Sequence, residues 1–380
     1  MRPALALTLS TCMIATPPVA ATSQVPSRAV VDTLPRGIVR TTSPGPTSWT
    51  STNGWRLELE RVIQPADGSP GELGNPFTVQ VLDDGGLLVV DQKPMSIKLF
   101  NANGGFVRTL GREGAGPGEY RAPQVVVFGD SIFVHDHGLN RGTVMPMNGG
   151  GVRTFPTTCC IRFAPIAVDI GGRFWVAGPG RSDDRQWLVF SPAGDRIDSL
   201  PEMPVGEERR WIVPQARPLV PLSPENRTLI LRDGTLLLGN TAAYQFWVTR
   251  TGRDTARTFR RTNVLAERAP VAVRESLFAA HTRGPDVRAV AALGDIPTTY
   301  PLWREFVEDG GGNLWVLVGG EAGRPTRLEV FGPDGRFLGS VASPFVTLGW
   351  TGWSRERVAQ IGTDDNDLPL IRVYRIVKGG

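Results

Sequence analysis

Two histidines and an aspartate stand together at the end of an apolar run, "SIFVHDHG". His135 and His137 are two residues apart, so on a strand they share one face while Asp136 points to the other. Two imidazoles so placed could bind a metal ion, but zinc sites use three or four protein ligands, and no third stands nearby in the sequence. The alternative is that Asp136 accepts hydrogen bonds from backbone N–H groups of the following turn. We expect that second role.

A second acidic stretch, "GTDDNDLP", offers calcium-type oxygen ligands at Asp364, Asp365, Asn366 and Asp367. It lacks the glycine and the distal glutamate of an EF-type loop, so a solvated turn is the expectation and calcium the alternative. The sequence shows no serine-centred nucleophile motif and no defensible pair of catalytic carboxylates. His281, the remaining histidine, lies in a stretch of helical spacing. The sequence therefore predicts no catalytic residues, no metal and no cofactor.

The stretch "GREGAGPGEYRAPQ" is rich in glycine and proline directly after a strand-like alternation. A phosphate cradle would require Lys followed by Ser or Thr, or a helix that opens after the last glycine. Here Glu119 and Tyr120 follow, and then the β-branched run Val125–Val127. The loop therefore joins strand to strand, which does not favour nucleotide binding.

Arginines are frequent in the expected surface loops, and Arg suits bidentate recognition of carboxylate or phosphate. Arg112, Arg121 and Arg162 would lie on neighbouring repeats, with Glu119 fixing the first of them. We predict these four as ligand-binding residues at the entrance of a central channel, for an anionic group. The alternative is mixed surface charge without a ligand, since scattered charged side chains need no function.

The elements that would position these residues repeat along the chain. A cassette of four short strands recurs, as in "PFTVQV", "LLVVD", "SIKLF" and "FVRTL" of the first copy. The second strands, such as Leu87–Val90, Leu236–Leu238 and Leu314–Val318, are continuously apolar, as expected of strands covered on both faces. Glycines precede the fourth strands, where tight hairpins need positive φ: Gly104, Gly150, Gly194, Gly252 and Gly335.

The copies begin near residues 87, 132, 174, 236, 314 and 357, so two long intervals must hold insertions. One of them, residues 265–300, has helical spacing at Val271, Val273, Leu277 and Phe278 and predicts one or two short helices between repeats four and five. The sixth copy lacks its last strand, and "WRLELERVI", residues 55–63, alternates as an outermost strand should. Its donation to the last repeat would close a ring of six.

These residues resemble a known family. The stretch from "FVRTLGREGAGPGEY" to "GLNRGTVMPMNGGG" is similar to an NHL-type repeat, with Asp136, Asn140 and Arg141 at the characteristic positions and Asp91 matching the aspartate of the preceding repeat. "GREGAGPGEY" is similar to a signature of secreted bacterial propellers of the NHL/TolB-like group. The resemblance implies an all-β, six-bladed β-propeller over residues 55–380, with its strongest motif confined to blades one and two.

The N-terminal residues and the cysteines indicate where the protein is expected to be located. Residues 1–21 read as a secretory signal peptide, with lipidation at Cys12 as the disfavoured alternative. Residues 22–54 are rich in Ser, Thr and Pro and predict a linker or arm. Export would leave adjacent Cys159 and Cys160, as two buried thiols or a vicinal disulfide. We expect a monomer in the periplasm or outside the cell, without a transmembrane segment.

The net charge of +4 is small for 380 residues and rests almost wholly on arginine. It predicts no nucleic-acid partner and at most a modest preference for anionic ligands. Propellers host many unrelated activities, so function must come from a site. The sequence favours a non-enzymatic binding protein for an extracytoplasmic glycan, peptide or protein. The alternative is a lactonase-type hydrolase with a divalent cation in the channel, which the first-strand residues Asn75, Gln124, Pro165, Thr228, Trp303 and Phe345 do not favour.

Overall fold

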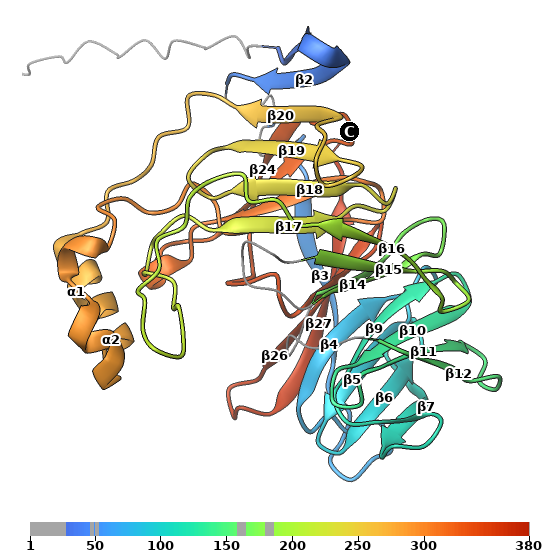
Figure 1. Ribbon diagram of the computed structural model, residues 1–380. Coiled ribbons are helices and arrows are strands. Elements are labelled where there is room, and N and C mark those ends of the chain that lie inside the picture. Colours follow the sequence, from blue (N-terminus) through green and yellow to red (C-terminus); the bar gives the residue numbers. More distant parts are fainter. Residues whose placement is uncertain (1–27, 46–48, 50–52, 158–164, 179–185, 380) are drawn as a thin grey trace, which may run out of the picture.

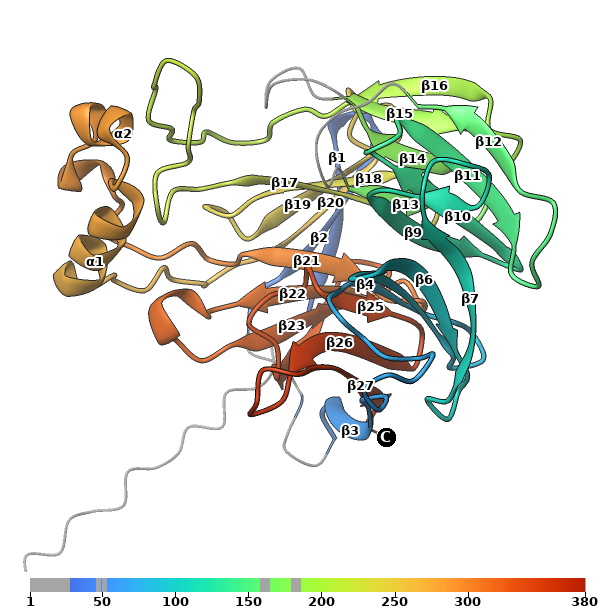
Figure 2. The ribbon, with the colours of Figure 1, turned by 90° about the horizontal axis from the view of Figure 1, so that it is seen from below.

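The computed structural model describes residues 28–45, 49, 53–157, 165–178 and 186–379. Six sheets stand in a ring, and two short helices lie beyond the strand ends on one side (Figure 1, Figure 2). The protein is an all-β, six-bladed propeller with four-stranded antiparallel blades, as the sequence predicted.

The first half of the described chain builds three blades. Blade one is formed by β4 (Pro76–Val81), β5 (Leu87–Gln92), β6 (Met95–Phe100), β7 (Phe106–Glu113) and the short β8 (Glu119–Tyr120). Blade two is formed by β9 (Pro123–Phe128), β10 (Ser131–Asp136), β11 (Arg141–Pro146) and β12 (Arg153–Pro156). Blade three is formed by β13 (Ile166–Val168), β14 (Phe174–Ala177), β15 (Gln186–Phe190) and β16 (Arg196–Pro201).

The second half adds three more blades, two of which take strands from the N-terminal region. Blade four is formed by β17 (Asn226–Ile230), β18 (Leu236–Asn240), β19 (Gln245–Thr249) and β20 (Arg257–Arg261), extended by β1 (Val30–Leu34) and β2 (Ile38–Ser43). Blade five is formed by β21 (Glu305–Glu308), β22 (Leu314–Val318), β23 (Arg327–Phe331) and β24 (Phe337–Ala342). Blade six is formed by β25 (Thr351–Trp353), β26 (Arg357–Thr363), β27 (Pro369–Val377) and β3 (Arg56–Ile63).

The helices are short. The two α-helices, α1 (Val271–His281) and α2 (Pro285–Val290), lie in the connection between blades four and five, where the sequence predicted them. Single 3₁₀ turns are η1 (Pro35–Gly37), η2 (Leu293–Asp295) and η3 (Glu321–Gly323). None of the helices in the described ranges is long and apolar enough to cross a membrane.

The first strand of each blade lies innermost. β4 packs against β25 and β9, β9 against β13, and β17 against β21. The second strands β5, β18 and β22 are buried almost throughout, as their continuous apolar sequences predicted. The five turn glycines named above all have positive φ, so a residue with a Cβ would be strained there.

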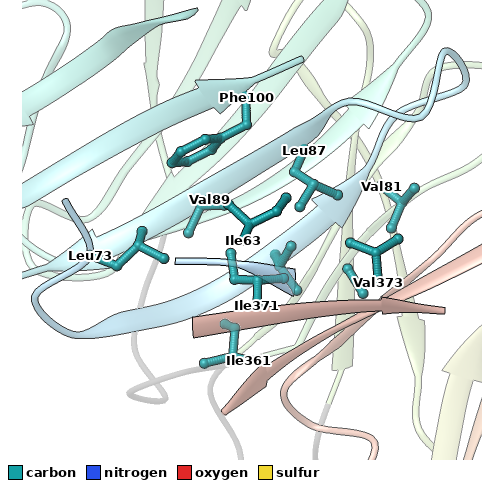
Figure 3. Packing of buried hydrophobic residues seen from close by; sticks show 11 residues of the cluster. Ile63, Leu73, Val81, Leu87, Val89, Phe100, Ile361, Ile371 and Val373 are labelled. Atoms are coloured by element: carbon teal, nitrogen blue, oxygen red, sulfur yellow. The ribbon is translucent and has the colours of Figure 1, made fainter. Parts of the chain in front are cut away.

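Six hydrophobic clusters hold the ring together, and each bridges two neighbouring blades. Figure 3 shows the cluster at the seam where the ring closes, between blades six and one. Ile63 of β3 lies there against Ile371 and Val373 of β27 and against Leu87 and Val89 of β5. The N-terminal strand therefore contributes both a sheet edge and core to the closure.

β3 closes blade six as predicted. It pairs antiparallel with β27, from Ile63 opposite Ile371 to Arg56 opposite Val377. Glu58 accepts hydrogen bonds from Arg375 of β27 at 2.9 Å and from Arg56 of its own strand at 2.6 Å. The sixth blade thus combines three strands from the C-terminal end with one from the N-terminal region.

The glycine-rich stretch is the connection from the outermost strand of blade one to the innermost strand of blade two. Part of it folds back as β8, which pairs in parallel with β7. Arg141 donates hydrogen bonds to the carbonyl oxygens of Ala115 at 3.0 Å and Gly116 at 3.2 Å. The loop is therefore held in place by hydrogen bonds, and its glycines allow the chain to turn there.

Asp136 fixes this connection through hydrogen bonds. Its carboxylate is fully buried and accepts from the N–H groups of Gly138 and Leu139 in the following turn, which confirms the predicted role. It also accepts from the N–H groups of Arg121 and Ala122, at 2.8 and 3.1 Å. One carboxylate thus joins the incoming crossover to the turn after β10.

Asp91 does the same in blade one, where it accepts from the N–H groups of Gly74, Asn75 and Lys93. The buried ammonium of Lys98 also donates to it, at 2.9 Å. The two aspartates of the NHL-type resemblance therefore have one structural role in this chain.

A repeated pair that the sequence analysis missed lies at the opposite ends of the blades. In "DIGGRFW" and "DGGGNLW", an aspartate accepts a 2.9 Å hydrogen bond from the indole N–H of the tryptophan six residues later: Asp169 with Trp175, and Asp309 with Trp315. Blades one and four carry leucine at both positions, Leu82 with Leu88 and Leu231 with Leu237. In these four blades the two positions are therefore occupied either by an Asp–Trp pair or by two leucines.

The N-terminal arm adds a hairpin to blade four. β1 and β2 pair antiparallel, and β2 runs parallel to β20, with Thr41 opposite Phe259. Thr41 donates to the carbonyl of Asp334 at 2.9 Å, and the N–H of Phe337 donates to the hydroxyl of Ser43 at 3.0 Å. The arm therefore holds blade four to the neighbouring turn of blade five.

Candidate binding site beneath the cap

Two insertions pack together beyond the strand ends of blades four and five. We call residues 205–223 and 265–301 the cap; they account for the two long intervals between sequence repeats. Trp211, Val220 and Ile296 form a small buried core with Leu277 and Phe278 of α1. Figures 1 and 2 both show α1 and α2 on this side of the molecule.

Polar contacts fix the cap internally and to the propeller. The indole N–H of Trp211 donates to Asp295 at 2.8 Å, and the N–H of Ala292 donates to the same carboxylate at 2.7 Å. These bonds hold the pKa of Asp295 below its usual value. The side chain of Asn226, at the start of β17, accepts from the N–H groups of Val205 and Gly206 at 3.0 Å.

A cavity of about 280 Å³ lies between the cap and the propeller. Its walls come from the segment before β17, from α1, from the turn after β18 and from the connections that flank β21 and β22. The lining residues are Pro221, Leu222, Ser223, Glu225, Arg227, Thr241, Leu277, His281, Pro301, Trp303, Arg304 and Glu321.

The charged side chains of this cavity occur as opposite pairs. Glu225 lies 2.6 Å from Arg227, two residues along and on the same face of the chain. Glu321 lies 3.6 Å from Arg304 and 3.1 Å from Arg324. Two carboxylates are thus balanced by guanidinium groups. Burial nevertheless raises the pKa of Glu321 above its usual value.

Several polar groups of the lining have no hydrogen-bond partner in the described structure. The hydroxyl of Ser223, whose residue is 1% exposed, is one, and Oε1 of Glu321 and Nε of Arg227 are two others. His281 bonds through Nδ1 to the carbonyl of Leu277 at 2.8 Å. Buried polar groups are nearly always hydrogen-bonded, so this set is expected to bind solvent or a ligand.

A second cavity, of about 590 Å³, lies on the other side of the turn after β18. Asn240, Ala242 and Ala243 line it, whereas Thr241 between them lines the first cavity. Both cavities therefore lie between the cap and blade four.

The residues predicted for ligand binding lie elsewhere. Arg112, on the outermost strand of blade one, donates to Glu119 at 2.9 and 3.1 Å and remains 79% exposed. Glu119 also accepts from the N–H groups of Gly116 and Ala115, and these bonds with that to Arg112 keep its pKa below its usual value. Arg121 is exposed beside β9. Arg162, like Cys159 and Cys160, lies outside the described residues.

The structure places His135 and His137 at the end of β10. His135 is 1% exposed, and neither ring nitrogen has a hydrogen-bond partner. Burial lowers its pKa to about 4, with a smaller contribution from His137, so the imidazole is neutral at neutral pH. The described residues contain no group of three or more His, Cys, Asp or Glu side chains able to hold a metal ion.

The acidic stretch at 364–367 forms a turn of blade six. Asp364 accepts from the N–H groups of Asn366 and Leu368, both at 2.9 Å, and from the side chain of Gln64 at 2.8 Å. The following three side chains are exposed. Its geometry is that of the solvated turn that the sequence predicted.

Glu308, at the end of β21, is a titrating group that sequence analysis did not single out. Its carboxylate accepts from the N–H of Arg232 at 2.6 Å, and burial raises its pKa to about 7. Because the folded state holds the proton more tightly than the unfolded chain, Glu308 should make the protein less stable as pH rises from about 4.5 to about 7. The cost above pH 7 is about 3 kcal/mol.

Glu308→Gln retains an acceptor for the Arg232 N–H but cannot ionise. We expect the variant to be more stable than the wild type at pH 8 and equal to it near pH 4, by urea unfolding at each pH. Since the difference between the two proteins is measured, titration of other groups such as His135 cancels. A difference that is constant with pH would contradict the assignment.

The protein is thus a six-bladed propeller in which the cap covers a cavity on one face. No family model and no curated protein matches the chain. Among solved structures, a putative exported protein from Bacteroides fragilis aligns with a TM-score of 0.51 at 13% identity, over 89% of this chain and 100% of its own. A member of the DUF4221 family from Bacteroides vulgatus aligns with a TM-score of 0.50 at 10% identity, over 87% and 100%.

Virginiamycin B lyase from Staphylococcus aureus aligns more distantly, with a TM-score of 0.41 at 11% identity over 83% of this chain and 88% of that chain. At these identities the first two likenesses show the propeller fold alone. The similarity to NHL/TolB-like propellers stays a prediction from the motifs.

Proposed function

We propose that this protein is an exported, non-enzymatic binding module that holds its ligand between the cap and the propeller. The observation that carries the proposal is the set of buried polar atoms without a hydrogen bond, Ser223 Oγ, Glu321 Oε1 and Arg227 Nε, around a cavity of about 280 Å³. A ligand pocket typically combines an apolar wall with a few such groups. Here Leu222, Leu277 and Pro301 supply that wall.

Among a glycan, a peptide and a protein, the cavity favours a glycan. Each sugar hydroxyl both donates and accepts hydrogen bonds. The Glu225–Arg227 and Glu321–Arg304 pairs place acceptors beside donors without net charge. An anionic ligand would instead be favoured by unpaired arginines, so a neutral saccharide suits these pairs better than an acidic one.

Export is proposed on two grounds. The first 21 residues have the composition of a secretory signal. A structural neighbour of the same fold is described as a putative exported protein. The lactonase-type alternative requires a metal in the channel, and the described residues offer no group of three or more His, Cys, Asp or Glu for one.

A glycan screen followed by calorimetry tests the proposal. For the best saccharide, Glu321→Gln should weaken binding about tenfold to a hundredfold, because a hydrogen bond to a charged group contributes about 1.5–3 kcal/mol. Ser223→Ala should weaken it less. Glu275→Gln, at an exposed position of α1, is the matched control in the same cap and should bind as the wild type does.

The ligand-binding arginines predicted from the sequence, Arg112, Arg121 and Arg162, lead to a different expected result. If the ligand is acidic and binds there, Arg112→Ala with Arg162→Ala should weaken binding most at low salt, where screening is least. Cap variants would then leave affinity unchanged, and the cap assignment would be wrong. Turnover of any screened sugar or lactone would overturn the non-enzymatic proposal.

A further inference from the structure

A third cavity lies at the far end of the propeller from the cap. Asn226, the first residue of β17, binds the cap, and Arg232 follows the other end of the same strand. Arg232 lines a cavity of about 620 Å³ together with turns of blades one, two, five and six. Because these turns follow the innermost strands, the cavity is the mouth of the central channel.

Four charged side chains at this mouth lie on four different blades. Asp83 comes from blade one, Asp130 from blade two, Arg232 from blade four and Arg355 from blade six, and all four are exposed. Among the described residues, none of these side chains forms a hydrogen bond or an ion pair. The arginines beneath the cap, in contrast, are paired with carboxylates.

Backbone contacts fix the turns that carry the two arginines. The carbonyl of Arg232 accepts from the N–H of Ile170 in blade three at 2.7 Å, and its N–H donates to Glu308 of blade five at 2.6 Å. Blade six approaches so closely that a Cβ on Gly310 would lie 2.5 Å from the backbone nitrogen of Arg355. These contacts fix the backbone positions from which the two arginine side chains extend.

We propose that the channel mouth binds a short peptide with a free ammonium and a free carboxylate end. The cavity carries guanidinium groups from blades four and six and carboxylates from blades one and two, Asp84 beside Asp83 included. This lining matches a ligand that carries both charges at separated points, whereas a polyanion would meet the aspartates and a polycation the arginines. Phe128, Trp353 and Met147 line the same cavity and offer an apolar surface for the peptide's side chains. The site is independent of the one beneath the cap.

Calorimetry with leucyl-phenylalanine tests this site, with its N-acetylated and C-amidated forms as probes. The unblocked dipeptide should bind at least about tenfold more tightly than either blocked form, and salt should weaken its binding. Arg232→Ala with Arg355→Ala should abolish the preference for a free carboxylate. Asp83→Asn with Asp84→Asn and Asp130→Asn should abolish the preference for a free ammonium and leave the other intact.

Arg253→Ala and Asp67→Asn remove exposed charges away from the cavity and should retain both preferences. Unchanged melting of each variant shows that the fold persists. The proposal is overturned if the unblocked dipeptide does not bind, or if it binds no more tightly than the blocked forms. It is also overturned if the channel-mouth variants keep the preferences for free ends.

Discussion

A chain that begins at residue 66 is expected to lose the native fold. It lacks β3, so β27 presents an unpaired edge along the whole of its pairing with that strand. It also lacks Ile63, which is 4% exposed in the seam between blades six and one, and Leu57 and Trp55, which pack in the seam between blades five and six. Loss of one large buried aliphatic side chain from a core costs about 2–5 kcal/mol. The stabilisation lost with these three side chains is comparable to a typical net stability of about 5–15 kcal/mol.

Circular dichroism, thermal melting and gel filtration measure the loss, which should appear as aggregation through the open edge. A chain that begins at residue 53 is the matched control. It lacks the β1–β2 hairpin but keeps β3, and blade four retains its own four strands, so a folded monomer with a lower melting temperature is expected. A synthetic peptide of residues 53–65 should rescue the shorter chain. A chain from residue 66 that stays monomeric with unchanged melting would refute closure by β3.

Asp136→Ala is expected to destabilise the protein by about 3–5 kcal/mol, among the largest effects of a single substitution. The fully buried carboxylate satisfies four backbone N–H groups, at 2.8 to 3.2 Å, on two sides of the blade junction. Alanine would leave these donors unpaired, and each unsatisfied buried donor costs about 1–3 kcal/mol unless water reaches it.

Urea unfolding gives the free energy, and limited proteolysis between Gly114 and Tyr120 reports whether the crossover is released. Asp136→Asn keeps one carbonyl acceptor and should lose roughly half as much stability. Asp364→Ala removes a comparable turn carboxylate from a partly exposed site, where water can replace it, and should cost about 1 kcal/mol. A loss no larger for Asp136→Ala than for Asp364→Ala would show that the four bonds do not stabilise the junction.

The blades could be predicted because their periodicity is local. Continuous apolar runs indicated second strands, and the alternation of residues 55–63 indicated a strand for the incomplete last blade. β8 was not predicted, because a two-residue parallel pairing leaves no periodic signal. The spacing of "DIGGRFW" and "DGGGNLW" would have revealed the Asp–Trp pair, since the same two residue types recur six positions apart.

The candidate site was predicted less well than the fold. Interval lengths located the insertions, but Ser223, Glu225 and Glu321 stand in no motif and meet only because the cap folds over blades four and five. Arginine content suggested an anion-binding face. Several arginines instead pair with a glutamate two residues away, as Arg227 does with Glu225 and Arg56 with Glu58. On a strand such neighbours share a face, and this local pattern can be read from sequence.

The long-range contacts of β3 and of the N-terminal arm also set an order of events during synthesis. Glu58 and its partner Arg375 are 317 residues apart, and Thr41 lies 293 residues before Asp334. β3 is made well before β27, the strand with which it pairs, so it must wait unpaired while most of the blades form. Contacts so distant in sequence close slowly. The last step of folding should therefore be the pairing of β3 with β27, and slowing that step should expose sheet edges to aggregation.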